Sequence, residues 1–462
     1  MAYRFYTMKQ NSKTLSQKLA QTIINMAEEP LPSQIIETIK ICFLDYMACC
    51  VSGADSYLAH TVVKTLNVMG SGESLLLGRS EKGSPFGAAF FNGTVSTAEE
   101  LDDSHRYVGG FHPSATVLPA LIAAVERKKI SSNYFMKAML CGYEVGGRIC
   151  KAIERGHRAK GFHSTSTVGP MAAATSVCIS MQGDSQVLAH ALGIAGSSCS
   201  GLFAFLDDGA MGKYTHPGRA SAEGLLAASL ALKGMTGPST ILESKEGFLQ
   251  AYSNLPDKDP ITDLFDESYE ISNTYHKVHS ACGHAYPTLD AVLALKKNVP
   301  QLGDLLENLE VKVYRAATGL KRDQVKSITE ARFSIPFLVG MLIEKGSLTK
   351  RDWNEEVIEN PKIRKLASLV EVVEDADLTK RFPDIRSAKI TAKLKDGRVI
   401  KHKSDSPFGM PENPVQWSDI VEKFHACTDK VLSDKSRNTV LEMVQNLEQV
   451  SSMEQVFQAF KQ

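Results

Sequence analysis

Apolar residues at helical spacing dominate the first 240 residues of the chain. They recur every three or four positions at Leu15, Leu19 and Ile23, and again from Pro32 to Val51. This is the pattern of helices that bury one face. We find no run with the strict alternation of a strand before residue 240, and we count at least eight helical segments there. Besides the two above, they lie at 58–69, 85–98, 114–127, 134–154, 168–181, 187–198 and 219–233.

The pattern changes near residue 270. Apolar and polar residues alternate from Leu309 to Ala316 and from Ala388 to Lys395, and Asp396-Gly397 is a strong hairpin signal before the next short strand. Helical period returns at 286–297, at 335–345 and from Trp417 onward. We therefore predict a mainly α fold. A large helical domain is formed by both chain ends (1–270 and 405–462), and a smaller α+β lid domain (271–404) is inserted between them.

Length and charge narrow the functional classes. A chain of 462 residues exceeds one ordinary core, which agrees with two domains. Lys plus Arg equals Asp plus Glu at 52 each, so no net charge favours nucleic acid or an anionic membrane. No apolar run is long enough to span a membrane. We expect neither a nucleic-acid partner nor a membrane.

Nine scattered cysteines and the first ten residues bear on location. The cysteines lack the spacing of a disulfide scaffold or a zinc site, so we expect free thiols in a reducing compartment. Met1 to Gln10 does not have the plan of a secretion signal. We predict a cytoplasmic protein, and the sequence leaves an organelle address open.

A dense acidic run stands in otherwise small and apolar sequence. Glu99, Glu100, Asp102 and Asp103 fall within five residues, and His105 follows. Buried carboxylates must be paired or line a cavity, because an unpaired buried charge is costly. We interpret this run, with Ser104 and His112, as half of an active site.

Cationic and imidazole groups elsewhere supply the other half. His163, Lys213 with His216, and the run from Tyr275 to His284 lie in small or apolar surroundings. Histidines move protons near neutral pH, and lysines hold carboxylates or enolate oxygens. Together they predict a cationic pocket for a small anion.

Each residue also has a plainer interpretation. A single histidine can be purely structural, Lys213 can be a solvated side chain, and Asp102-Asp103 can cap helix ends. The histidines and cysteine of 276–284 fit no standard zinc spacing, so we expect no metal. The chain has no Gly-x-Gly-x-x-Gly after a strand, Walker loop or Gly-x-Ser-x-Gly elbow, which disfavours nucleotide and serine-hydrolase chemistry.

At these same stretches the chain resembles the MmgE/PrpD family, which includes 2-methylcitrate dehydratase, cis-aconitate decarboxylase and iminodisuccinate epimerase. The resemblance covers almost the whole chain. It rests on Phe91-Asn92-Gly93, Glu100-Leu101-Asp102-Asp103-Ser104, His112-Pro113-Ser114, Gly161-Phe162-His163, Lys213, His216-Pro217-Gly218, Lys277, Cys282, His284, Ala331-Arg332-Phe333-Ser334-Ile335-Pro336-Phe337 and Pro411-Glu412-Asn413-Pro414.

The resemblance implies a helical domain with an inserted lid, a homodimer, no cofactor, and an active site between the domains. Two positions depart from the family: Glu100 stands where Asp is more common, and Ser104 where Thr is. The residues it implies divide into two sets. The catalytic set is Glu100, Ser104, His112, His163, Lys213 and Lys277, and the substrate-binding set is Asp102, His216, Cys282 and His284.

A lyase acting on a small di- or tricarboxylic acid follows from the resemblance. Breaking a bond next to a carboxylate places charge on its oxygens, which lysines and a protonated histidine would stabilise. We expect His112 or His163 to move the proton, and Glu100 and Ser104 to orient the groups. A 2-methylcitrate dehydratase-like reaction is the main hypothesis. Decarboxylation of cis-aconitate, an epimerase reaction and a non-catalytic polycarboxylate-binding protein are the alternatives.

Overall fold

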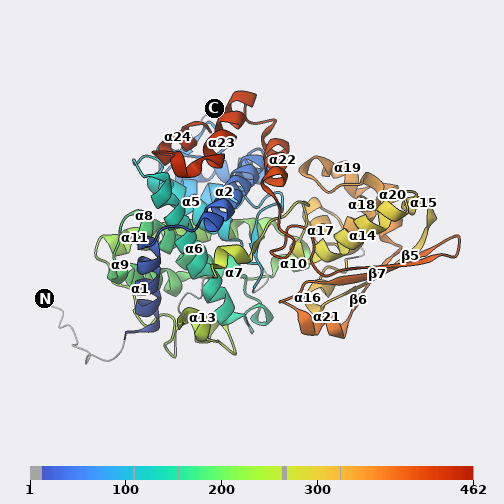
Figure 1. Ribbon diagram of the computed structural model, residues 1–462, viewed down its shortest axis with the longest axis horizontal. Helices are drawn as coiled ribbons and strands as arrows, with labels where there is room; N and C mark the ends of the chain where they lie inside the picture. Colours follow the sequence, from blue (N-terminus) through green and yellow to red (C-terminus); the bar gives the residue numbers. More distant parts are fainter. Residues whose placement is uncertain (1–12, 108–109, 155, 263–267, 323, 461–462) are drawn as a thin grey trace.

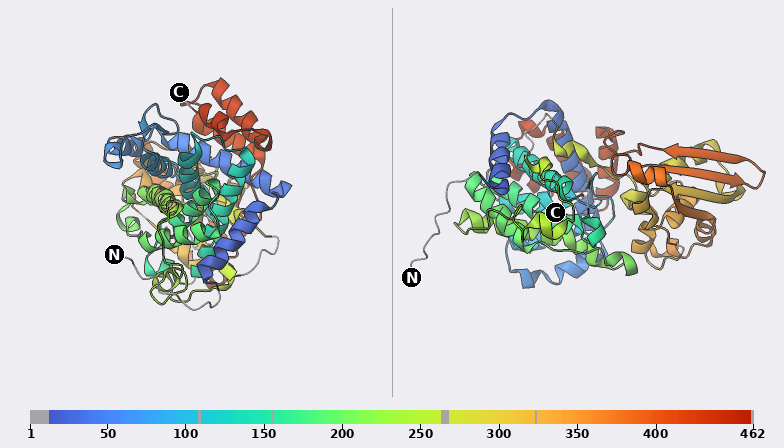
Figure 2. Two further views of the ribbon diagram at one scale, coloured as in Figure 1. Left: turned by 90° about the vertical axis from the view of Figure 1, so that its left-hand side faces the viewer. Right: turned by 90° about the horizontal axis from the view of Figure 1, so that it is seen from below.

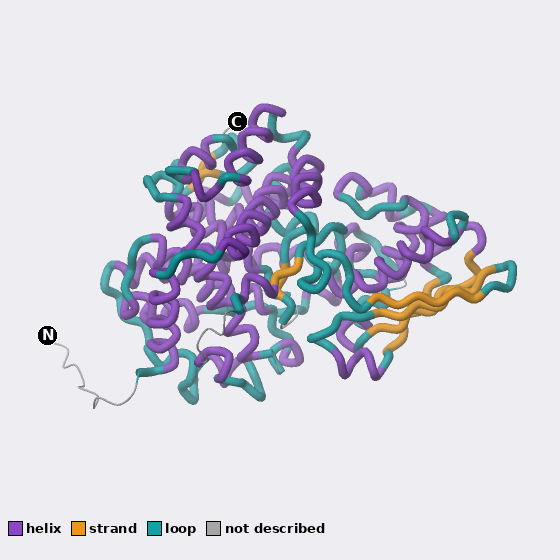
Figure 3. The backbone as a smooth tube through the Cα atoms, viewed as in Figure 1, coloured by secondary structure: helices purple, strands orange, loops and turns teal. Residues whose placement is uncertain are grey.

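The computed structural model describes residues 13–107, 110–154, 156–262, 268–322 and 324–460. The expectation about Met1 to Gln10 lies outside these residues. Two bodies lie side by side in Figures 1 and 2. One is helical and contains the C-terminal end, and the other carries the long strands that Figure 3 draws in orange. The predicted mainly α fold is confirmed.

The helical body begins with α1 (Leu15–Glu28) and α2 (Ser33–Gly53). The long helices that follow match the helical segments of the sequence. They are α4 (Pro85–Val95), α5 (Pro113–Val125), α6 (Ser132–Ile153), α8 (Gly169–Ser180), α9 (Ser185–Ser198) and α11 (Thr215–Leu232). The C-terminal helices complete the body: α22 (Trp417–Thr428), α23 (Asp434–Gln445) and α24 (Met453–Gln458).

A glycine allows a close helix crossing in this body. α11 packs against α4, α5, α8 and α9. A Cβ on Gly218 of α11 would lie 2.2 Å from Thr94 Oγ1 and 2.3 Å from the Phe90 carbonyl oxygen of α4. Because glycine has no side chain, the backbones of α11 and α4 can cross in contact, and no larger residue fits at this position. The crossing places the acidic run that follows α4 beside the Lys213 segment that precedes α11.

The lid is an α+β unit around one four-stranded sheet. Its strand order is β6-β5-β7-β8, with β5 and β6 parallel and the other pairs antiparallel. The strands are β5 (Leu306–Val313), β6 (Val370–Glu374), β7 (Ala388–Leu394) and β8 (Val399–Ser404). Gly397 has φ +89° in the predicted hairpin between β7 and β8. α14 (Tyr286–Asn298) packs on β7 and β8, and α18 (Ile335–Lys345) packs on α14.

Two separate apolar cores underlie the two bodies. The first collects residues from Leu15 to Ile271 and again from Val415 to Phe460, and the second collects residues from Ala281 to Leu394. On this ground we propose 1–270 with 405–462 as one domain and 271–404 as the other.

Three local predictions were wrong, and one strand was missed. The strand predicted from Leu309 to Ala316 runs too far, because β5 ends at Val313 and Arg315–Thr318 forms the short helix α16. Residues 58–69 form α3 (Tyr57–Val63) and then a 3₁₀ turn (Leu66–Met69), where β-branched Val62, Val63 and Thr65 disfavour one continuous helix. Strands do occur before residue 240, at β1 (Ser74–Leu75), β2 (Lys82–Gly83) and β3 (Ser104–His105). Each has two residues, too short for any periodicity. Strand β6 was missed altogether.

Candidate active site

A pocket between the helical domain and the lid holds most of the predicted site. Eight of the ten predicted residues line it, namely Glu100, Ser104, His112, His163, Lys213, Lys277, Cys282 and His284. The first five come from the helical domain and the last three from the start of the lid. Their side chains meet because β3 pairs with β4 (Thr274–Tyr275), which joins the acidic run to the lid.

Glu100 is the anionic centre of the pocket. Its backbone has φ +52°, a left-handed conformation that non-glycine residues rarely adopt and that is typical of functional sites. Its carboxylate pairs with Lys213 Nζ on one oxygen and lies 3.4 Å from Lys277 Nζ on the other. Burial alone would raise the pKa of Glu100, but the two lysines outweigh it and lower that pKa. Glu100 is therefore ionised.

Asp102 lies behind the pocket and contacts two of its members. Its Oδ2 is 2.6 Å from His112 Nδ1, and its Oδ1 is 3.4 Å from Lys277 Nζ. Burial works against ionisation, but His112 and Lys277 hold the pKa of Asp102 far below its usual range. The same carboxylates keep the pKa of Lys277 well above normal against the effect of burial. Asp102 does not line the pocket, so it faces His112 rather than a bound substrate.

The tautomer of His112 follows from its surroundings. Its Nδ1 lies 2.8 Å from the backbone oxygen of Asp103, and a carbonyl can only accept. Nδ1 therefore carries the proton, and Nε2 is the nitrogen left for chemistry. The Asp102 carboxylate lies on the same Nδ1 side and helps to hold the ring in this orientation.

His163 and His216 form a neutral pair. Their Nδ1 atoms are 2.7 Å apart. Burial, then the neighbouring His216, His112 and Lys213, hold the pKa of His163 well below its usual value. Burial also lowers the pKa of His216, to about 4. His216 lines a neighbouring surface cavity with Leu202 and Phe205, so it reaches the pocket only through His163.

The remaining predicted residues occupy the pocket wall. Ser104 Oγ donates to the Phe111 backbone oxygen at 3.0 Å. His284 Nδ1 lies 2.8 Å from the Tyr314 hydroxyl, and burial lowers the pKa of His284 to about 3. Burial raises the pKa of the Cys282 thiol. These last two groups are therefore uncharged at neutral pH.

The predicted cationic pocket carries less positive charge than its lysines and histidines alone suggest. Both lysines face carboxylates, and His163, His216 and His284 are neutral because burial penalises their charged form. The sequence did not point to Phe203 or Arg386, which also line the pocket, whereas Tyr275 and Phe333 lie in runs that it singled out. Of these, Arg386 adds a charge, and as an isolated lid arginine it belongs to no motif.

Two models of known protein families match this chain. The MmgE/PrpD N-terminal domain matches residues 17–261, and the MmgE/PrpD C-terminal domain matches residues 279–449. The chain belongs to the MmgE/PrpD family. The resemblance read from the sequence is thus confirmed.

Several relatives within the MmgE/PrpD family have named activities. Cis-aconitate decarboxylase of Homo sapiens is 26% identical over 94% of this chain and 92% of that protein. The Aspergillus terreus decarboxylase is 24% identical, over 93% and 92%. The mitochondrial 2-methylcitrate dehydratase of Yarrowia lipolytica is 23% identical, over 90% and 85%. These relatives agree with the predicted lyase and with its stated alternative.

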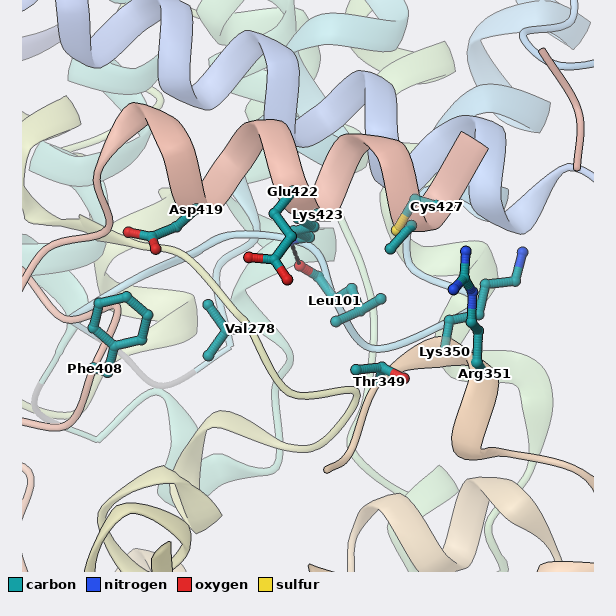
Figure 4. Close-up of a pocket in the computed structure, with 11 residues that line it drawn as sticks. Leu101, Val278, Thr349, Lys350, Arg351, Phe408, Asp419, Glu422, Lys423 and Cys427 are labelled. Atoms are coloured by element: carbon teal, nitrogen blue, oxygen red, sulfur yellow. Dashed lines mark hydrogen bonds between the residues drawn. The ribbon is translucent and has the colours of Figure 1, made fainter. Parts of the chain in front are cut away.

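A second cavity in this MmgE/PrpD chain lies behind the active-site backbone, between α22 and the lid (Figure 4). Leu101 and Val278, the neighbours of Glu100 and Lys277, form part of its wall. The Lys423 side chain of α22 also lines this cavity. Its Nζ donates to Leu101 O at 2.5 Å and to Lys277 O at 2.8 Å, and it pairs with Asp45 at 2.5 Å. One buried amine thus holds both catalytic segments.

The described residues contain neither a metal-binding group nor a membrane-spanning helix. Over 13–107, 110–154, 156–262, 268–322 and 324–460, no three His, Cys, Asp or Glu side chains are grouped to hold a metal ion. Within the same ranges, no helix combines the length and apolar character that crossing a membrane needs.

Proposed function

We propose that this chain is a cofactor-independent lyase that breaks a bond next to a carboxylate in a small tricarboxylic acid. One observation carries the proposal: the Asp102–His112 pair and the Lys213–Glu100–Lys277 network meet in one buried pocket between the two domains. The first can move a proton, and the second can stabilise an anion.

The roles follow from the charge states. His112 exchanges a proton with the substrate through Nε2, and Asp102 stabilises the imidazolium that forms. Lys213 and Lys277 balance the negative charge that develops on the carboxylate next to the broken bond. Because His163 is neutral, it can accept a proton or donate a hydrogen bond, but it adds no positive charge. Glu100 and Ser104 orient these groups.

Cis-aconitate is the first acid to test and 2-methylcitrate the second. The decarboxylase relatives align over more of this chain than the dehydratase relatives do. In decarboxylation the C–C bond breaks, carbon dioxide leaves, and the carbon takes a proton. In dehydration a proton and a hydroxyl leave from adjacent carbons.

The pocket is small in this structure, at about 50 Å³, so we expect lining side chains to move when a tricarboxylic acid binds.

Proton NMR in deuterated water tests the proposal. The purified protein is incubated separately with cis-aconitate, 2-methylcitrate, citrate and iminodisuccinate. The expected result is conversion of one tricarboxylic acid. Decarboxylation would give a product that carries solvent deuterium at the carbon that lost carbon dioxide, and dehydration would give an unsaturated product without it. Tight binding without conversion of any acid would instead indicate the non-catalytic binding protein, and conversion of iminodisuccinate alone would indicate the epimerase.

We further propose a cytoplasmic homodimer. The nine cysteines, all free thiols, suit a reducing compartment. The dimer is the state that family membership leads us to expect.

A further inference from the structure

Arg386 is a buried lid cation that faces the pocket. It lies two residues before β7, is 4% exposed, and lines the pocket opposite the helical domain. Its guanidinium carbon lies 4.8 Å from the centre of the Tyr275 ring and 5.9 Å from that of Phe382. The rings hold the planar group in place and exclude water from it.

Arg386 differs from the two pocket lysines in having no counter-ion. Lys213 and Lys277 already face Glu100 and Asp102. In the described part of the chain no carboxylate lies within ion-pair distance of Arg386. Its Nη2 donates to the Arg106 backbone oxygen at 2.8 Å, whereas its Nε is buried without a hydrogen-bond partner there.

A buried guanidinium with an unused donor needs a partner. Leaving such a donor unmet costs free energy, and burying an unpaired charge costs more. The pocket's ionised side chains are three cations, Lys213, Lys277 and Arg386, and one lining carboxylate, Glu100, with Asp102 behind it. A ligand carboxylate would supply the missing negative charge, and the planar fork of arginine suits a carboxylate.

We propose that Arg386 binds a carboxylate of the substrate and thereby selects acids that carry a charged group on the lid side of the pocket. This inference rests on the proposed function, and it names the residue that makes the site specific for a polycarboxylate. Arg386 binds the part of the substrate that does not react, whereas His112 and the lysines act at the reacting carbon.

Calorimetric titration with tricarballylate tests the inference. This saturated tricarboxylate has neither a hydroxyl nor a double bond to react, so its dissociation constant reports binding alone. Arg386→Met should weaken binding about 10- to 100-fold, the range for losing a charge-assisted hydrogen bond. Arg386→Lys should bind with intermediate affinity, because it keeps the charge but not the fork. The matched control is Arg315→Met, an exposed lid arginine paired with Glu374, which should bind like the wild type.

The outcomes separate the two proposals. Wild-type affinity in Arg386→Met would overturn the role of Arg386 and leave the proposed function standing. No binding of tricarballylate by the wild-type protein, together with no turnover of any acid, would overturn the proposed function itself. If Arg386→Met shows no thermal unfolding transition and is therefore not folded, the test is made with Arg386→Lys. A loss of affinity for tricarballylate of about threefold or more in Arg386→Lys supports the role of Arg386, and unchanged affinity contradicts it.

Discussion

At the residue scale, two adjacent carboxyl groups have pKa values that are shifted in opposite directions. Asp102 faces His112 and Lys277, which keep its pKa low in spite of burial. Asp103 faces only neutral donors: Oδ1 accepts from the Ser114 backbone amide and hydroxyl, and Oδ2 accepts from the Tyr143 hydroxyl. Burial therefore raises the pKa of Asp103 to about 7. Asp102 supports chemistry, and Asp103 supports the turn that presents it.

Asp103 makes stability depend on pH. Its usual pKa is 3.8 and its folded pKa is about 7, so between these values the folded state binds more protons than the unfolded state. Stability from this group is present at low pH and is lost as the pH rises toward 7. Asp103→Asn should remove that loss, which is at most about 1.4 kcal/mol per pH unit. Urea unfolding at several pH values between 4 and 7 measures it.

The quantity compared is the change in the free energy of unfolding with pH. The free energy of unfolding of the wild type should fall relative to Asp103→Asn as the pH rises. Exposed Asp207→Asn is the control and should follow the wild type. Parallel pH curves for the wild type and Asp103→Asn would contradict the assignment.

At the scale of elements, helix α22 supports the active site from a distance in sequence. Lys423 bonds the backbone oxygens of Leu101 and Lys277, one in each catalytic segment, and balances Asp45 of α2. The C-terminal helices thus fix the spacing between the acidic run and the first lid residues.

Lys423→Met should affect both stability and turnover. It leaves the Asp45 carboxylate buried without its cation, which costs about 3–5 kcal/mol, and it frees two carbonyls that position Glu100 and Lys277. Chemical denaturation and kcat measure the two effects. Adding Asp45→Asn should restore part of the stability but not the turnover. The control is Lys430→Met, at an exposed lysine just after α22, which should keep wild-type stability and turnover. Equal stability and turnover of Lys423→Met and Lys430→Met would contradict the role of Lys423.

At the scale of the whole molecule, features that depend on neighbouring residues were predicted from the sequence, and features that depend on distant residues were not. Helical period and the Asp396-Gly397 turn are local, so α18, α14 and the β7–β8 hairpin were predicted closely. Strand β6 was missed because it is short and pairs in parallel with β5, about 60 residues away. Such a pair has no connecting hairpin turn that could be recognised in the sequence.

The same limit applies to the site. The acidic run and the isolated cations identified most lining residues. Their charge states depend on partners far apart in the chain, such as Glu100 with Lys213, and so did not follow from sequence. Arg386 reaches the pocket only through the fold of the lid.

The assembly is the remaining prediction at this scale. Light scattering on the full chain should give about twice the 50.4 kDa of one chain if it is the proposed homodimer. A mass near 50.4 kDa at all concentrations would contradict the proposed homodimer.

Turnover by His112→Ala tests the central claim most directly. Wild type, His112→Ala and the exposed control His60→Ala are each given the converted acid in deuterated water and followed by NMR. We predict that His112→Ala lowers kcat about a hundredfold or more and slows deuterium incorporation equally, while His60→Ala matches the wild type. Near-wild-type turnover by His112→Ala would contradict the assignment of the proton transfer to the Asp102–His112 pair.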